Sequence, residues 1–322
     1  MEEPISRACH RARAGPEHSW GFNREKRETP VAERSQSYRT RAVILRRRNY
    51  SDADRILTVF TPRMGKRMLI AKGSRKTTSR QAGHLELFSH ANLQVARART
   101  WDIITESATV ESFLQLRNDL DRIGRAAYVC ELVDAFTAEE DDFEPVWELL
   151  LLCLRELDGT SGDTTKWDML LRWFELQLLR MMGFQPKLFA CLGCGDDLLP
   201  VENFLQLDAG GVFCPSCGRS ARGAEPINVA TLRILRHLSR NQWESLRGLR
   251  IGLATALAAE SVLQRYLVTI LERRLKSTDF VYRLRQFPAE EASSGEPATP
   301  SAASRVNRRP LDPGNSNSEG DR

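Results

Sequence analysis

Residues 191–218 read CLGCGDDLLPVENFLQLDAGGVFCPSCG and predict the most distinctive element of the chain. Two Cys-x-x-Cys pairs begin and end this stretch, Cys191 with Cys194 and Cys214 with Cys217. Two thiolates three positions apart in a turn can bind one metal ion, and a second such turn completes a tetrahedral shell. Because four thiolates leave no open coordination position, the spacing predicts one structural zinc ion and not a catalytic one. The alternative, two disulfides or free thiols, needs an oxidising compartment that nothing else in the sequence supports.

Between the two cysteine pairs the sequence has the pattern of a β-hairpin. Apolar residues alternate over 204–213 on both sides of Asp208-Ala209-Gly210-Gly211, and Asp and Gly favour a tight turn. A zinc ribbon of roughly 30 residues cannot bury much core, so the metal would replace the core as the folding determinant. Ribbons occur in proteins of many functions, so this element alone does not indicate an activity.

Length and composition predict a protein of the cytosol. The chain has 322 residues, which leaves room for two or three domains. No uncharged apolar stretch is long enough to cross a bilayer, and the N-terminus has no hydrophobic run of a signal peptide. The other cysteines, Cys9, Cys130 and Cys153, fit no disulfide framework, and Cys130 and Cys153 are interpreted as buried core residues. We therefore expect a reducing compartment and no membrane partner.

Charge is distributed unevenly along the chain. The net charge is only +5, but residues 41–112 contain fourteen Lys and Arg against six Asp and Glu. Residues 113–190 contain eight against fifteen, and residues 191–287 contain thirteen against nine. A basic module next to an acidic one predicts that the first module binds a polyanion and that the two modules have separate roles.

The composition also divides the chain into segments. Residues 1–39 and 288–322 are polar and non-periodic, and they are predicted to be disordered. Residues 40–112 contain short β-type runs separated by turn signals, five or six strands that suit a small closed barrel, with the OB-fold as the leading candidate. These runs are 42–46, 55–60, 67–72, 85–88, 92–97 and 103–109.

From Phe113 onward the apolar residues follow a helical period. Stripes within 128–136, 167–182 and 262–271 predict core-facing helices, and Asp163 or Thr164 and Asn228 are predicted to begin two of the helices. Residues 113–190 and 219–287 would then form one helical domain, with the ribbon 191–218 inserted into it or appended to it. The predicted fold class is an α+β multidomain protein: an N-terminal OB-fold β-barrel followed by an α-helical domain that carries a four-cysteine zinc ribbon.

The segment from Lys72 to Arg80 is the strongest candidate for ligand binding. Its four cations alternate with Ser and Thr after Gly73, so that they can neutralise phosphates while hydroxyls donate hydrogen bonds. The predicted nucleic-acid contacts are Lys72, Arg75, Lys76, Arg80, Arg46, Arg97 and Arg99. A solvated loop without function is the alternative. The aromatic residues Tyr50, Phe60, Phe88 and Trp101 could stack on bases or could form barrel core, so binding to the backbone without sequence preference is the prediction.

Catalytic motifs are mostly absent, which predicts a protein that is not an enzyme. Gly65-Lys66 is followed by Arg67, so no P-loop is present. His84-Leu85-Glu86 and a later Cys-x-x-Cys are similar to zinc deaminases, but Phe213 stands where their proline would precede the cysteine. Two alternatives stay open: a zinc-containing enzyme subunit that acts on nucleic acid, and an adaptor that binds partners through the acidic helical domain and no DNA.

The order of parts resembles a known family. A specific run starts at Tyr50-x-x-x-Asp54-Arg55-Ile56-Leu57 and continues through Gly65 to Ala71-Lys72-Gly73. With Tyr128, Glu131-Leu132, the cysteine pairs around Gly210-Gly211, and Leu275-Lys276-Ser277, it resembles RecO, the bacterial recombination-repair mediators. The resemblance covers residues 40–285, nearly everything outside the two tails. The N-terminal extension 1–39 departs from the family pattern.

The resemblance implies an OB-fold, a helical domain and a zinc-binding module. It also implies binding of single- and double-stranded DNA and annealing of complementary strands. Family members work with a RecR-type protein, and the implied partner set extends to a RecF-type protein, in loading RecA onto DNA coated by single-stranded-DNA-binding protein. The family's Ala-Lys-Gly region corresponds here to Lys72, Arg75, Lys76 and Arg80. A cytoplasmic, nucleoid-associated bacterial protein is the implied localisation.

Overall fold

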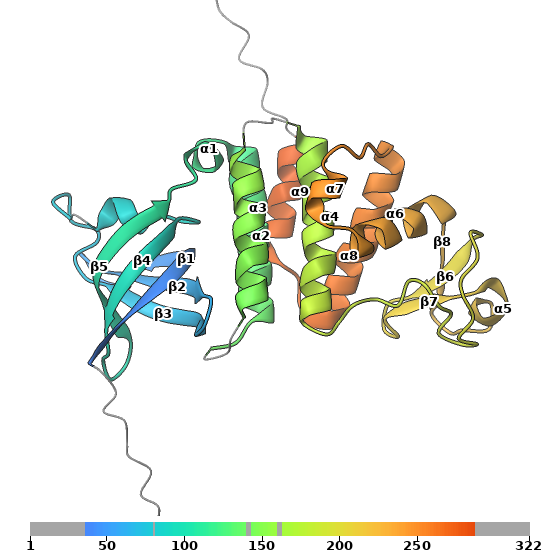
Figure 1. Cartoon of the computed structure of the whole chain (residues 1–322), viewed down its shortest axis with the longest axis horizontal. Coiled ribbons are helices and arrows are strands. Elements are labelled where there is room, and N and C mark those ends of the chain that lie inside the picture. The colour runs from blue at the N-terminus through green and yellow to red at the C-terminus, as the bar shows by residue number, and fades with distance from the viewer. Residues whose placement is uncertain (1–35, 80, 140–142, 160–162, 287–322) are drawn as a thin grey trace, which may run out of the picture.

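The computed structural model describes residues 36–79, 81–139, 143–159 and 163–286. These residues form a β-barrel, a helical body and a small three-stranded ribbon that follow one another along the long axis of the molecule (Figure 1). The predicted fold class is therefore confirmed, with an OB-like barrel ahead of a helical domain that carries the cysteine ribbon. Within the described ranges, no helix combines the length and the apolar character that a membrane span needs.

Five strands close the barrel in the order β1-β2-β3-β5-β4, and β1 pairs with both β2 and β4. Neighbouring strands are antiparallel except β3 and β5, which run parallel, as in an OB-fold. Alternate residues such as Ile44, Leu57 and Leu69 point inward and form the barrel core. The strands are β1 (Ser37–Asn49), β2 (Arg55–Thr61), β3 (Gly65–Ala71), β4 (His90–Ala96) and β5 (Asp102–Glu111).

Strand β1 begins before the predicted boundary at Thr40. Ser37 pairs with Ala96 and Tyr38 with Val95, so residues 37–39 belong to the sheet. Tyr38 also donates a hydrogen bond to Asp102 Oδ2 at 2.9 Å. The sequence around Tyr38 is polar and charged, and this end of β1 is held by strand pairing, by the partly buried Tyr38 hydroxyl and by packing of Tyr38 against the barrel core.

Residues 85–88 were expected to be a strand, and this prediction is wrong. A 3-10 turn, η1 (Ala82–His84), precedes them, and Leu85 is fully buried inside the barrel. Phe88 has a φ of 68° and packs into the helical body instead. The chain reverses between the two residues, where the amide of Ser89 donates to the carbonyl of Glu86 at 3.3 Å. An apolar run whose side chains enter two different cores forms a turn here.

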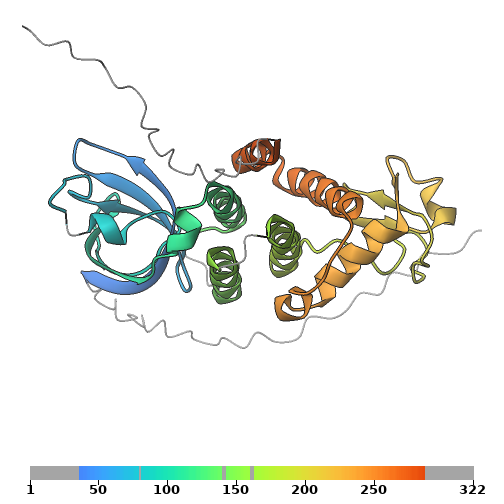
Figure 2. The same cartoon turned by 90° about the horizontal axis from the view of Figure 1, so that it is seen from above.

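The helical body lies against one side of the barrel. Figure 2 shows α2 and α3 next to the barrel, with α4 behind them and α6 and α8 farther out. Asp163 and Asn228 accept hydrogen bonds from the first amides of α4 and α6, as predicted for helix caps. The helices are α1 (Leu114–Arg117), α2 (Leu120–Phe136), α3 (Glu144–Asp158), α4 (Thr164–Met181), α6 (Val229–Arg240), α7 (Trp243–Leu246), α8 (Leu253–Leu271) and α9 (Lys276–Gln286).

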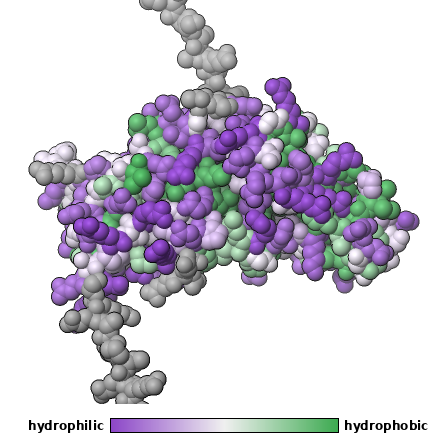
Figure 3. Space-filling view, in the orientation of Figure 1, coloured by the Kyte–Doolittle hydropathy of each residue, from purple (hydrophilic) through white to green (hydrophobic). Residues whose placement is uncertain are grey.

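One continuous core joins the barrel to the helices. Phe60 points out of the barrel, and its ring centroid lies 6.4 Å from that of Trp147 on α3. Lys66 Nζ donates to the Asp134 carbonyl at 2.7 Å and lies 3.1 Å from the Asp134 carboxylate, which ties β3 to α2. Hydrophilic residues cover most of the face seen in Figure 3, and hydrophobic residues gather near the place where the barrel meets the helices. The barrel is thus fixed relative to the helical body.

The ribbon is longer than its predicted limits of 191–218. Strands β6 (Asn203–Gln206) and β7 (Gly211–Phe213) form the predicted hairpin, and the short helix α5 (Pro215–Gly218) follows. A third strand, β8 (Glu225–Ile227), pairs with the other edge of β6. This strand is only three residues long and contains a proline, so its sequence carries no alternating pattern that could predict it.

Candidate metal centre and nucleic-acid interface

The four predicted cysteines come together at one point of the ribbon. Their Sγ atoms all lie within 4.8 Å of one another. The Sγ atoms of Cys194 and Cys214 are 3.9 Å apart. In a tetrahedral zinc–thiolate centre with Zn–S bonds of about 2.3 Å, the sulfurs are roughly 3.8 Å apart. The cluster therefore has the donor set and the size to hold a metal ion with all four positions filled by protein.

The backbone around the cluster supports a thiolate at Cys191. The amides of Gly193 and Cys214 donate to Cys191 Sγ at 3.3 Å and 3.2 Å. Burial raises the pKa of the Cys191 thiol, but these amides outweigh it and bring that pKa to about 6. A Cβ atom at Gly193 would lie 2.9 Å from Cys217 Sγ, so only glycine fits this close approach.

Two arginines of α6 fasten the ribbon to the helical body. Arg236 Nε donates to the Leu188 carbonyl at 2.7 Å, just before the first cysteine. The guanidinium carbon of Arg240 lies 3.5 Å from the centre of the Phe189 ring. These contacts were not predicted, because the partners are distant in sequence. They place the four-cysteine cluster close to the joint between the ribbon and the helices.

The predicted basic loop lies at one end of the barrel, where it is folded onto the turn between β1 and β2. Gly73 N donates to Asp54 Oδ1 at 2.8 Å, and Arg75 N donates to the Ala53 carbonyl at 3.0 Å. Arg75 Nη1 also donates to the Ser51 carbonyl at 2.6 Å. The loop is therefore a shaped surface and not an unstructured tether.

A third loop reaches the same end of the barrel. Strand β5 begins beside the end of β3, because Leu69 pairs with Asp102, and this places the turn 97–101 near the basic loop. Tyr50 of the first turn and Trp101 of this third turn are in contact, with ring centroids 5.4 Å apart. We call the surface formed by residues 50–54, 72–79 and 97–101 the loop end.

The loop end gathers most of the predicted nucleic-acid contacts. Lys72, Lys76 and Arg99 are exposed, and their side chains make no hydrogen bond or ion pair with other described residues. Arg97 lies over the Tyr38 ring, with its guanidinium carbon 5.1 Å from the ring centre. Arg75 keeps its exposed position through Ser51. Arg80 is outside the residues that the structure describes.

Arg46 has a different place from the other predicted contacts. It lies where β1 meets the helical body and forms an ion pair with Asp134 of α2 at 3.3 Å. It lines a concavity of about 470 Å³ together with Glu131, Arg273 and Lys276. Arg46 is therefore paired at the junction between the barrel and the helical body, and it is not part of the loop end.

The structure separates the four aromatic candidates. Phe60 and Phe88 are buried in the core shared with the helices, so they cannot meet a ligand. Tyr50 is 56% exposed and Trp101 is partly exposed, both at the loop end. Sequence alone could not separate them, since all four lie in or next to short β-type runs.

The deaminase-like combination of His84 and Glu86 with cysteines is not assembled. His84 Nδ1 lies 2.9 Å from Thr109 Oγ1, and Glu86 pairs with Arg47 at 2.6 Å. Among the described residues, the group of possible metal ligands contains only the four cysteines. The observed contacts of the two residues are those of barrel surface groups.

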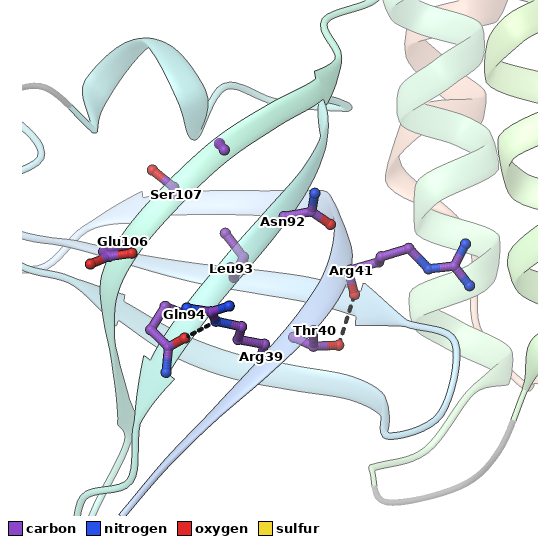
Figure 4. A pocket seen from close by; sticks show the side chains of 9 residues that line it. Arg39, Thr40, Arg41, Asn92, Leu93, Gln94, Glu106 and Ser107 are labelled. Atoms are coloured by element: carbon purple, nitrogen blue, oxygen red, sulfur yellow. Dashed lines mark hydrogen bonds between the residues drawn. The ribbon is translucent and has the colours of Figure 1, made fainter.

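The structure shows a second polar surface that the sequence did not indicate. Figure 4 shows a concavity on the outside of β1, β4 and β5, with a volume of about 470 Å³. Its cations are already bound: Arg39 Nε donates to Gln94 Oε1 at 2.6 Å, and Arg41 pairs with Glu144 at 3.3 Å. Glu106 adds a negative charge to the same wall. This face is less suited to a polyanion than the loop end.

Comparisons with known proteins agree with this architecture. The family described as Recombination protein O N terminal matches residues 35–113, and Recombination protein O C terminal matches residues 117–279. A protein named DNA repair protein RecO from Roseiflexus sp. (strain RS-1) is 40% identical over 268 residues, which are 83% of this chain and 93% of that protein. Another of that name from Symbiobacterium thermophilum is 36% identical over 250 residues, 77% of this chain and 98% of that protein. The chain belongs to the RecO family of DNA repair proteins.

Proposed function

We propose that this protein is a DNA-binding recombination mediator and not an enzyme. It would bind single- and double-stranded DNA through the loop end and anneal complementary strands. With RecR-type and RecF-type partners, it would help to load a RecA-type recombinase onto DNA coated by single-stranded-DNA-binding protein. Its place would be the bacterial cytoplasm, in association with the nucleoid. The family supports the setting in DNA repair, and the loop end supports the mode of binding.

The observation that carries the proposal is the convergence of free cations. Lys72, Lys76 and Arg99 come from two separate loops, are exposed, and have no acidic partner among the described residues. Holding like charges close together is unfavourable unless a polyanion neutralises them. Phosphates spaced along a strand would do so, and the released counterions would favour binding.

The chemistry of the loop end favours the DNA backbone over base edges. Lysine and arginine side chains on turns reach phosphates without entering a groove. The three loops present no helix or β-ribbon that could enter the major groove. Binding should therefore tolerate any sequence, as annealing and recombinase loading require.

The metal centre would serve this function indirectly. We infer that the ion is zinc, held by Cys191, Cys194, Cys214 and Cys217, because tetrahedral sulfur sites of this size suit zinc. When bound, zinc would cross-link the two knuckles and hold the ribbon folded. The cysteines would supply no reactive position, so the ion would be a structural element of the scaffold.

An annealing assay tests the proposal. The loop variant replaces Lys72, Arg75 and Lys76 with alanine. The control variant replaces three exposed arginines outside the barrel with alanine: Arg222 of the ribbon, Arg233 of α6 and Arg250 of the α7–α8 loop. Both lose three positive charges. Complementary oligonucleotides, bare or coated with single-stranded-DNA-binding protein, are mixed with each protein and pairing is followed by fluorescence transfer.

The native protein and the control variant should accelerate pairing equally. The loop variant should be slower by on the order of tenfold at about 0.1 M salt, because three phosphate contacts are lost. A native protein that binds no DNA even at low salt would overturn the proposal in favour of an adaptor. Metal-dependent turnover of the oligonucleotides would overturn it in favour of an enzyme.

A further inference from the structure

Tyr50 and Trp101 form an aromatic contact that neither core of the protein explains. Their ring planes meet at 87°, and the centroids are 5.4 Å apart. Neither residue belongs to the barrel core or to the core shared with the helices. Tyr50 is 56% exposed, whereas the large aromatic residues Phe60 and Trp147 are fully buried. Two large rings thus remain in contact with solvent at the tips of two turns.

The edge-to-face geometry leaves ring surface available. In such a contact the edge of one ring meets the face of the other, so the remaining faces are free for a further planar group. An apolar face exposed to water is unfavourable, and a flat partner would remove it from water. The contact also fixes the two turns relative to each other, so the available faces are held in place before a ligand arrives.

The surrounding charges indicate which planar group would fit. Arg75 is bound to the carbonyl of Ser51, the residue after Tyr50. The exposed Arg99 is two residues before Trp101 in the third loop. Cations beside exposed rings match the alternation of phosphates and bases along a polynucleotide, in which aromatic side chains stack on bases while cations contact the backbone.

Stacking on a side chain requires a base whose face is free. In a duplex each base is covered above and below by its neighbours, whereas in a single strand bases can turn out and stack on a protein ring. We propose that Tyr50 and Trp101 are a base-stacking pair that gives the loop end a preference for unpaired strands. This inference rests on the proposed function, since it assumes that the cations of the loop end contact the backbone.

The test compares three probes of equal length: an oligo-dT strand, an abasic strand with the same phosphates, and a duplex. The full-length protein is compared with a Tyr50→Ala, Trp101→Ala variant and with a Tyr50→Phe, Trp101→Phe variant that keeps the rings. Phe184→Ala is the control, because Phe184 is a similarly exposed aromatic residue, 44% accessible, outside the loop end. Thermal melting checks that all four proteins are folded.

The native protein should bind oligo-dT on the order of tenfold more tightly than the abasic strand. The alanine variant should lose this advantage while its affinity for the abasic strand and the duplex changes less than about twofold, and its salt dependence should be unchanged because stacking releases no ions. The phenylalanine variant should keep the preference, yet lose the part of the DNA-induced fluorescence quenching that comes from Trp101.

Equal affinity of the native protein for oligo-dT and abasic strands would overturn the inference. So would an alanine variant whose affinity falls equally for all three probes, because the two rings would then only hold the two turns together. In both cases binding that still depends on the basic loop leaves the proposed function standing. A native protein that binds none of the probes would overturn the proposed function as well.

Discussion

At the scale of single residues, the helical core contains a buried charged network. Tyr128 on α2 donates to Glu175 Oε1 on α4 at 2.6 Å, and Arg172 pairs with the same carboxylate and with Glu260 of α8 at 3.3 Å. Arg172 and Glu175 are almost inaccessible to solvent. Burying these charges is costly, so each depends on its partners. The network thereby fixes α2, α4 and α8 in position relative to one another.

Neutralising one member of this network should be strongly destabilising. A Glu175→Gln variant leaves the buried Arg172 with one carboxylate fewer, and we expect a loss of about 3–5 kcal/mol in the free energy of unfolding by urea. An Arg172→Met, Glu175→Leu double variant should recover part of that loss, because apolar side chains replace both charges. A single variant within about 1 kcal/mol of the native protein would contradict this account.

The pH dependence of stability should show the environment of Glu111. A hydrogen bond from Arg155, with Nε 2.7 Å from Glu111 Oε1, lowers the pKa of this carboxyl, and His90 at 2.8 Å adds to the effect. Since the folded pKa lies below the unfolded value of about 4.3, the stabilisation is present above that value and is lost as pH falls through the folded pKa.

The corresponding measurement is a series of urea unfolding midpoints between pH 6 and pH 3. The native midpoint should fall more steeply below about pH 4.3 than that of a Glu111→Gln variant, and the two curves should converge in acid. Parallel curves over the whole range would show that the ion pairs of Glu111 do not contribute.

At the scale of elements, the N-terminus of α9 is capped by one carboxylate, and Val281 packs the helix into the shared core. Glu131 of α2 accepts from Lys276 N at 3.0 Å, Ser277 N at 2.8 Å and Ser277 Oγ at 2.6 Å. The negative charge thus lies at the N-terminus of α9, where it interacts favourably with the positive end of the helix dipole. Figure 2 shows α9 beside α2, at the edge of the helical body.

Removal of this cap should release α9 and leave the remaining helices folded. We expect Glu131→Ala to cost about 1–2 kcal/mol and to raise hydrogen exchange in residues 276–286 selectively. Glu148→Ala, at an exposed position of α3, is the matched control and should leave exchange unchanged. Exchange in α9 that is the same in all three proteins would rule out the capping role.

The sequence predicted those elements whose start or packing depends on residues close together in the chain. Asn228 begins α6 because its own side chain accepts from Thr231 N at 2.8 Å, and this cap is visible in the sequence. Helix α9 was missed because its cap, Glu131, belongs to another helix. The run 85–88 was misassigned because Leu85 and Phe88 enter different cores, and no local period records which core a residue enters.

At the scale of the whole molecule, the metal centre is expected to stabilise the three-stranded ribbon at the far end from the barrel. A Cys191→Ser, Cys214→Ser variant should lose stoichiometric zinc, measured by atomic absorption, and hydrogen exchange should rise through the ribbon strands β6, β7 and β8. A Cys130→Ala, Cys153→Ala variant also loses two thiols and should keep the metal, because these residues are buried in the helical core. Full metal retention by the serine variant would refute the four-cysteine site.

The candidate sites differed in how far the sequence could locate them. The cysteines were found by spacing, because a metal shell imposes a fixed pattern on the chain. The cations of 72–76 are neighbours in sequence, so they were found as a run. Their association with Arg97 and Arg99 depends on the parallel pairing of β3 with β5, and the separation of Arg46 depends on Asp134 of a distant helix. Both are properties of the assembled molecule.

The salt dependence of DNA binding tests most directly whether the loop end binds the DNA backbone. Each phosphate that the protein neutralises adds about 0.7 to the slope of log affinity against log salt on single strands. The loop variant should therefore show a slope shallower than the native slope by about 2. The control variant, with three charges removed elsewhere, should keep the native slope. Identical slopes for the native protein and the loop variant would contradict the account.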